Sequence, residues 1–161
     1  MASPSKVERC RQAGLEAFGR IQQARPDLQM SLDLEPHELD LTLDIPVQAG
    51  LAFPVHLNLQ NIDELHLSAG ELWLSWFPCD DSRRLDSYVE SVVHLLNGTY
   101  RILQYRRGSR VVRADLQGPG NNGWQRLGRH EGFSLFPWPP ITYSIVQNFA
   151  APSAPSAPQG T

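Results

Sequence analysis

Apolar residues recur with the period of a helix near the start of the chain. They are Val7, Cys10, Gly14, Ala17, Phe18 and Ile21, which share one side of a helix. Ser5 and Glu8 have the spacing of a capping box, whose two side chains accept hydrogen bonds from backbone N–H groups at a helix start. Pro26 ends the pattern, because proline lacks the N–H donor that a helix interior needs. This region therefore predicts an amphipathic helix that begins near Lys6 and buries Cys10.

Between Leu28 and Phe77 the period shortens to two residues, which is typical of strands with one buried face. The alternating apolar positions are Leu28, Met30, Leu32 and Leu34, then Leu39, Leu41, Leu43 and Ile45, then Val55, Leu57 and Leu59. The polar residues between them favour an antiparallel sheet with one solvated face. The breaks in the pattern, at 36–37, 48–50, 61–63 and 69–70, are short enough for hairpin connections.

The last strand of this run differs from the others, because both of its faces are apolar. Leu72, Leu74 and Trp76 alternate on one face, and Trp73 and Phe77 occupy the other. Either another part of the chain covers this second face, or Trp73 and Phe77 form a binding groove or a dimer contact. The sequence leaves both explanations open.

A second helix and further strands follow. Its apolar residues are Leu85, Tyr88, Val89, Val92, Val93 and Leu96, with Asp81 or Ser82 as N-cap and Asn97-Gly98 as its end. Residues 100–106 and 110–117 flank a short turn and predict a hairpin. We expect a loop over 118–123, a short strand over 124–127, an extended aromatic segment over 133–140 and an edge strand over 141–146.

These elements predict an α+β fold within one domain, since 161 residues suit a single hydrophobic core. We expect a curved, mainly antiparallel sheet of about seven to nine strands, with two amphipathic helices packed on one face. The domain spans residues 1–149. Residues 150–161, an Ala/Pro/Ser segment with little to bury, are predicted to be a flexible tail.

Charge is distributed unevenly along the chain, although the formal net charge is only -3. Residues 26–82 contain eleven acidic side chains and no Lys or Arg. Residues 98–130 contain seven arginines and one acidic residue, Asp115. One explanation is that acidic and basic strands are neighbours in one sheet, where facing opposite charges stabilise each other. The other is that an acidic face remains uncompensated and binds a basic partner.

Candidate metal ligands are scattered along the chain. The five histidines, His37, His56, His66, His94 and His130, contain no pair two or four residues apart, so we expect no metal site and no cofactor. His56 and His66 fall on the polar phase of adjacent predicted strands, and Glu64 lies two residues from His66. We interpret all three as solvated sheet residues.

Cys79 is the one candidate nucleophile, because it precedes a predicted helix N-terminus whose free N–H groups would stabilise a thiolate. The adjacent Asp80 and Asp81 act against this by raising the pKa of the thiol, so we interpret Cys79 as structural. The chain has no Gly-x-Ser-x-Gly motif, and the 118–123 loop lacks the lysine and the following helix of a phosphate-binding loop. Whether the protein is an enzyme stays open, and these absences favour a non-catalytic role.

Other classes of partner are tested by composition. The arginine-rich hairpin with Tyr100, Tyr105 and Trp124 has the residue types of a platform for single-stranded nucleic acid. A pI of about 5.9 argues against nucleic acid as a partner.

No apolar run reaches the length of a membrane-spanning helix, and the first residues lack the apolar core of a secretory signal. The chain also has only two cysteines, which are too few for a disulfide scaffold and fit a reducing compartment. We therefore expect a cytoplasmic protein.

We therefore expect a non-catalytic protein-interaction module, adaptor-like or chaperone-like, that binds a protein partner or forms a homodimer. The candidate binding residues are Trp73, Phe77, Arg101 and Arg113. The alternative is a ligand-binding or enzymatic protein with a pocket between sheet and helices. Such a pocket would be lined by Trp73, Trp76, Tyr100 and Tyr105, with Arg101 holding an anionic group.

Overall fold

Two helices form where the apolar pattern predicts them. The computed structural model describes residues 4–37, 39–132 and 138–149. Helix α1 (Lys6–Ala24) begins at Ser5, whose hydroxyl oxygen accepts a hydrogen bond of 3.2 Å from the Glu8 N–H. Helix α2 (Ser82–Leu96) is capped by Asp81, whose carboxylate accepts from the Arg84 N–H at 3.0 Å. Each cap satisfies an N–H that has no partner within the helix.

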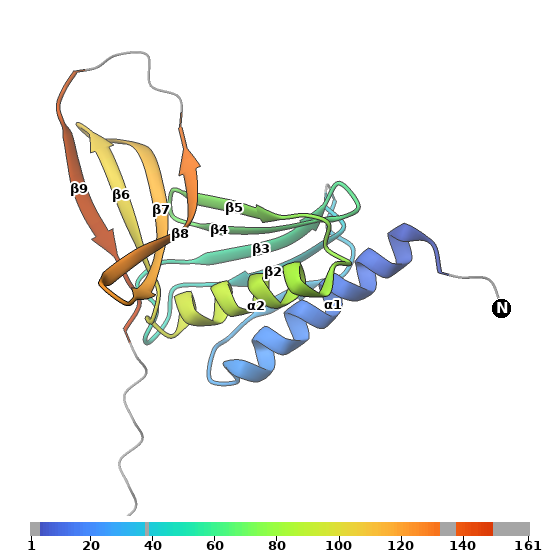
Figure 1. Cartoon of the computed structure of the whole chain (residues 1–161). Helices are drawn as coiled ribbons and strands as arrows, with labels where there is room; N and C mark the ends of the chain where they lie inside the picture. The colour runs from blue at the N-terminus through green and yellow to red at the C-terminus, as the bar shows by residue number, and fades with distance from the viewer. Residues whose placement is uncertain (1–3, 38, 133–137, 150–161) are drawn as a thin grey trace, which may run out of the picture.

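The first sheet contains the strands of the alternating region. They are β1 (Ser31–Asp33), β2 (Leu41–Ile45), β3 (Val55–Gln60), β4 (Glu64–Ala69) and β5 (Leu72–Trp76), all antiparallel and in chain order across the sheet. Both helices lie side by side along one face of this sheet (Figure 1). The residues of β2, β3 and β4 that point to the helices are fully buried, while the first predicted strand is only three residues long and exposed.

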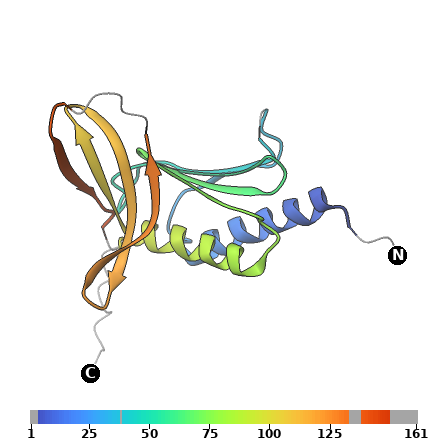
Figure 2. The same ribbon diagram turned by 45° about the horizontal axis from the view of Figure 1, so that its top comes forward.

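A second sheet contains β6 (Arg101–Arg107), β7 (Arg110–Gly120), β8 (Gly123–Glu131) and β9 (Ile141–Val146), in the order β8-β7-β6-β9. This sheet stands across the β5 end of the first sheet (Figures 1 and 2). Its inner face completes the core with Ile102, Ala114 and Leu116. A Cβ on Gly128 would lie 2.8 Å from Leu74 Cδ1, so glycine at this position permits the close approach of β8 to β5.

The predicted fold class is confirmed: the described residues form an α+β structure with two helices and nine antiparallel strands. The strands divide into two sheets rather than continuing in one curved sheet. The predicted 118–123 loop is shorter than expected, because Gly118, Pro119 and Gly120 extend β7 and pair with β8. The tail 150–161, and most of the 133–140 segment (residues 133–137), lie outside the described residues.

Candidate binding face

The two faces of the second sheet differ in chemistry. The inner face packs on the core, and the strand registers place a set of basic and aromatic side chains together on the outer face. We call this outer face the arginine–aromatic face: Arg101, Leu103, Tyr105, Arg107, Arg113, Asp115, Gln117, Trp124, Arg126, Arg129, Glu131, Ile141, Tyr143 and Ile145. Residues from all four strands therefore meet on one surface, although they span more than forty positions of the chain.

Cation–π and aromatic contacts order this face. The Arg101 guanidinium lies 4.0 Å from the centre of the Trp124 ring, and Arg113 lies 3.4 Å from the centre of Tyr105. Tyr105 in turn meets Tyr143 edge-on, with the ring centres 5.2 Å apart. Such contacts contribute about 0.5–1.5 kcal/mol each. They hold the arginine side chains against the sheet while Tyr143 remains 68% exposed.

Asp115 anchors the centre of the arginine–aromatic face and is only 2% exposed. Its carboxylate accepts hydrogen bonds from Arg129 Nε at 2.8 Å, Arg129 Nη2 at 3.1 Å and the Tyr105 hydroxyl at 3.1 Å. Burial alone would raise the pKa of Asp115, but the Arg129 and Tyr105 hydrogen bonds outweigh it and hold the pKa below its usual value. Asp115 is therefore a charged structural centre whose oxygens are occupied.

Several arginines of the second sheet remain uncompensated. Among the described residues, no carboxylate oxygen lies within 4.0 Å of Arg101, Arg106, Arg110 or Arg126. In the same part of the chain, no ion pair joins an acidic residue of the first sheet to an arginine of the second. The first of the two explanations for the charge distribution, that acidic and basic strands are neighbours in one sheet, is wrong, because the chain places them in two different sheets.

The four candidate binding residues do not form one site. Arg101 and Arg113 belong to the arginine–aromatic face, whereas Trp73 and Phe77 lie at the first sheet. Trp73 is 44% exposed and stacks on His66 with ring centres 4.6 Å apart, and His130 of β8 meets its edge. Phe77 follows the end of β5, is 55% exposed and lies 5.9 Å from Lys6 Nζ. Both aromatic side chains are thus at the surface, in separate places.

Sequence reasoning missed Arg126, Tyr143 and the two isoleucines of β9 as members of the face. A signal for β9 was present, since Ile141, Tyr143 and Ile145 alternate with Thr142 and Ser144. That pattern indicates a strand with one apolar face but not which strand lies beside it. The pairing of Tyr143 with Tyr105 is a long-range register that only the structure shows.

His66 is buried rather than solvated, which corrects the sequence interpretation. Trp73 from the neighbouring strand covers its ring, and His66 Nε2 lies 3.1 Å from Glu64 Oε2. The other ring nitrogen, Nδ1, has no hydrogen bond partner. Burial lowers the pKa of His66, although the Glu64 hydrogen bond partly opposes this. The folded state therefore favours the neutral imidazole.

This burial predicts a loss of stability on acidification. An unfolded histidine binds a proton near pH 6.5, and folded His66 resists protonation, so stability should fall as the pH drops below about 6.5. Replacing His66 with Gln should reduce the decrease in melting temperature between about pH 7.5 and pH 5.5. The matched control is His56→Gln, an exposed histidine that lies 2.7 Å from Asp44. Equal pH dependence of the wild type and His66→Gln would contradict the prediction.

The alternative ligand pocket is present only in part. Trp76 and Tyr100 do line a cavity of about 490 Å³ between β5, α2 and β8, together with Arg84 and Glu90. Trp73, Tyr105 and Arg101, the other residues expected there, do not line it. The expected aromatic and arginine side chains are therefore divided between this cavity and the two sheet faces.

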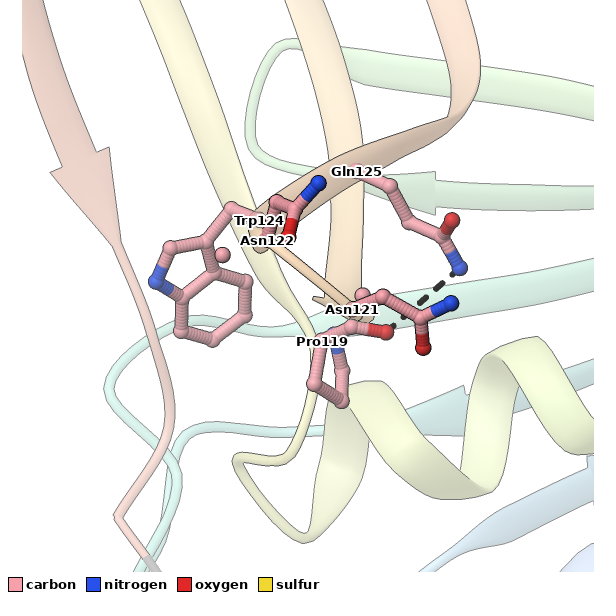
Figure 3. Close-up of a pocket in the computed structure, with 7 residues that line it drawn as sticks. Pro119, Asn121, Asn122, Trp124 and Gln125 are labelled. Atoms are coloured by element: carbon pink, nitrogen blue, oxygen red, sulfur yellow. Dashed lines mark hydrogen bonds between the residues drawn. The ribbon is translucent and has the colours of Figure 1, made fainter.

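The turn between β7 and β8 forms an open hollow of about 740 Å³, shown in Figure 3. Residues 119–125 line it, and none of them is charged. Trp124 and Gln125 point to opposite sides of the strand, and Gln125 donates a hydrogen bond of 3.4 Å to the Pro119 carbonyl oxygen. Apart from the Trp124 indole, the polar side chains of this hairpin are all amides, so it offers no acid, base or cation for chemistry.

The second cysteine lies in the core. Cys79 is buried, and its Sγ is 3.8 Å from the backbone oxygen of Cys10, which is also buried. Burial, followed by the effect of Cys10 and of nearby carboxylates, raises the pKa of Cys79 well above its usual value. A thiol that is inaccessible and held neutral is a poor nucleophile.

Within the part of the chain that the structure describes, no three His, Cys, Asp or Glu side chains gather as metal ligands, and neither helix is long and apolar enough to cross a membrane. Comparison of the whole chain with protein-family models, with curated proteins and with solved structures finds no match.

Proposed function

We propose that this chain is a non-catalytic protein-interaction module that binds an acidic segment of a partner protein on the arginine–aromatic face. The observation that carries the proposal is that two arginines of the outer sheet face, Arg101 and Arg126, have no carboxylate oxygen within 4.0 Å among the described residues. Guanidinium groups form paired hydrogen bonds with carboxylates, and the exposed Tyr143 adds apolar contact area. Arginine and tyrosine are also the residue types that contribute most at protein interfaces.

The contacts on this face favour a protein carboxylate over a nucleic acid. Nucleic-acid platforms leave aromatic ring faces open for base stacking. Here one face of the Trp124 ring and one face of the Tyr105 ring are already occupied by guanidinium groups. The formal net charge of -3 also weakens the long-range attraction of a polyanion, whereas a short acidic segment needs only the local cations.

The hydrogen bonding of the Asp115 carboxylate also fits a binding role better than a catalytic one. A general acid or base must reach a substrate with a free lone pair or proton. The Asp115 carboxylate instead accepts three hydrogen bonds and is buried beneath the arginine side chains. On this face, Asp115 positions Arg129 and Tyr105 for contact with a partner.

The test measures binding of poly-L-glutamate by fluorescence anisotropy at low salt. We expect the double variant Arg101→Ala/Arg126→Ala to bind at least about tenfold more weakly than the wild type. The control, Arg20→Ala/Arg83→Ala, makes the same change in charge on the two helices and should bind like the wild type. Equal loss in both variants, or no binding by the wild type, would refute the proposal. Tighter binding of oligothymidylate than of poly-L-glutamate would show that the face prefers nucleic acid.

A further inference from the structure

Strand β9 is an edge without the usual protection. It pairs with β6 on one side only, and within the described residues no strand pairs with its other side. Its six residues, Ile-Thr-Tyr-Ser-Ile-Val, contain no charge, no proline and no bulge. Natural proteins use those devices to prevent a foreign strand from pairing with an exposed edge. Within the described residues, one row of β9 N–H and C=O groups therefore has no strand partner.

The other edges of the two sheets are shielded. Strand β1 is only three residues long and ends with the charged residue Asp33. Close to this strand, Arg11 donates hydrogen bonds to the backbone oxygens of Leu34 and Asp40. At β5, the second sheet packs closely against the strand, with Gly128 of β8 next to Leu74. Strand β8 itself contains the charged residues Arg126, Arg129 and Glu131. Among the described edge strands, β9 is thus the one that lacks both charged residues and a close approach by the other sheet.

Charge next to β9 indicates what an added strand should contain. Arg106 of β6 points to the face opposite the arginine–aromatic face and reaches over β9, where its Nε donates to Ser144 Oγ at 3.1 Å. Its other donors bond to neutral oxygens, Gln104 Oε1 at 2.8 Å and the Ser109 carbonyl at 3.2 Å. Because adjacent strands lie about 4.8 Å apart, a carboxylate on an added strand would lie within reach of this guanidinium.

The opposite side of β9 is apolar. Ile141, Tyr143 and Ile145 project there and are exposed, so the same added strand would place apolar side chains beside them. Side chains alternate between the two faces of a strand. The edge therefore matches a segment in which acidic and apolar residues alternate.

We infer that β9 accepts an extended partner segment of alternating acidic and apolar residues as a fifth strand of the second sheet, with the acidic side chains on the Arg106 side. This inference rests on the proposed function, because it assumes that the partner is a protein. It adds the β9 edge as a second contact, separate from the arginine–aromatic face. Main-chain hydrogen bonds supply affinity in this binding mode, and the alternating side chains supply specificity.

The test uses the full chain and two short peptides of equal composition, one with alternating Glu and Val and one with all Glu before all Val. Hydrogen exchange and binding are measured for both. We expect only the alternating peptide to slow the exchange of β9 amides. Replacement of Arg106 with Gln should weaken its binding about tenfold, while Arg110→Gln, the same change at the hairpin turn, should leave binding unchanged. Unaltered hydrogen exchange in β3 and β4 confirms that each variant is folded.

The outcomes separate this inference from the proposed function. If poly-L-glutamate binding depends on Arg101 and Arg126 but neither peptide protects β9, strand addition is wrong and the proposed function stands. Equal binding and protection by both peptides would also overturn the inference, because the order of side chains would then not matter. Failure of all the acidic probes would refute both proposals.

Discussion

Replacing Asp115 with alanine is expected to lower the free energy of unfolding by about 1.5–3 kcal/mol. The reason is that Asp115 compensates partly buried cations: Arg129 bonds to it through two nitrogens, and Arg113 Nε lies 3.8 Å away. Removing the carboxylate leaves Arg113 without a counter-charge and Arg129 with only the exposed Glu131, and it leaves the Tyr105 hydroxyl without its acceptor. Urea denaturation of the purified variant measures the change.

The control for this prediction is Glu131→Ala. Glu131 also contacts Arg129, at 3.5 Å, but its side chain is exposed, so its removal should change stability by less than about 1 kcal/mol. The lowered pKa of Asp115 adds a pH signature, because its contribution is present above the unfolded pKa, near 3.9, and is lost as the pH falls through the folded pKa. Equal stability of the two variants would show that Asp115 is not an anchor.

The second large effect is expected at Tyr88, where alanine should cost about 3–5 kcal/mol. Tyr88 is fully buried between α2 and the first sheet and meets the edge of Trp76 at 5.2 Å between ring centres. Its hydroxyl donates a hydrogen bond of 3.0 Å to the backbone oxygen of His66. Alanine would leave a cavity at the point where the second helix contacts β4 and β5.

Two further variants test whether the expected loss at Tyr88 comes from its burial. The first separates the hydroxyl from the ring, and the second is a control at an exposed tyrosine. Tyr88→Phe keeps the ring and removes only the hydroxyl, so it should cost about 1 kcal/mol, near the net value of a buried hydrogen bond. Tyr143→Ala makes the same residue change at an exposed tyrosine and should cost no more than about 1.5 kcal/mol, the value of its edge-on contact with Tyr105. Chemical denaturation monitored by circular dichroism measures all three variants. A Tyr88→Ala cost close to that of Tyr143→Ala would contradict the packing that the structure shows.

Local patterns were sufficient to predict most of the elements. The helices and the strands β2 and β3 each bury one face, so their periods of 3.6 and two residues appear directly in the sequence. The division into two sheets could not be predicted in this way, because alternation does not specify which strands pair. Gly118-Pro119-Gly120 resembles a loop by local preference, yet pairing with β8 extends the strand through it.

Of the residues in the arginine–aromatic face, only the arginines could be identified as candidate binding residues from the sequence. Arg101 and Arg113 were identified from the density of charge along the chain, and both belong to the outer face. Their aromatic partners come from other strands, so the contacts depend on registers that no local pattern contains. His66 was misjudged for a related reason, because the side chain that buries it, Trp73, lies on the neighbouring strand.

The eleven acidic residues of 26–82 and the seven arginines of 98–130 belong to the parts of the chain that form different sheets, which gives the molecule an electric dipole despite its small net charge. A dipole rotates in the field of a charged surface before it touches that surface. An approaching acidic body would therefore turn this protein until β6 to β9 lead and the acidic sheet trails. Encounters that begin in random orientations would then end with the correct side forward, at a rate that decreases as salt screens the field.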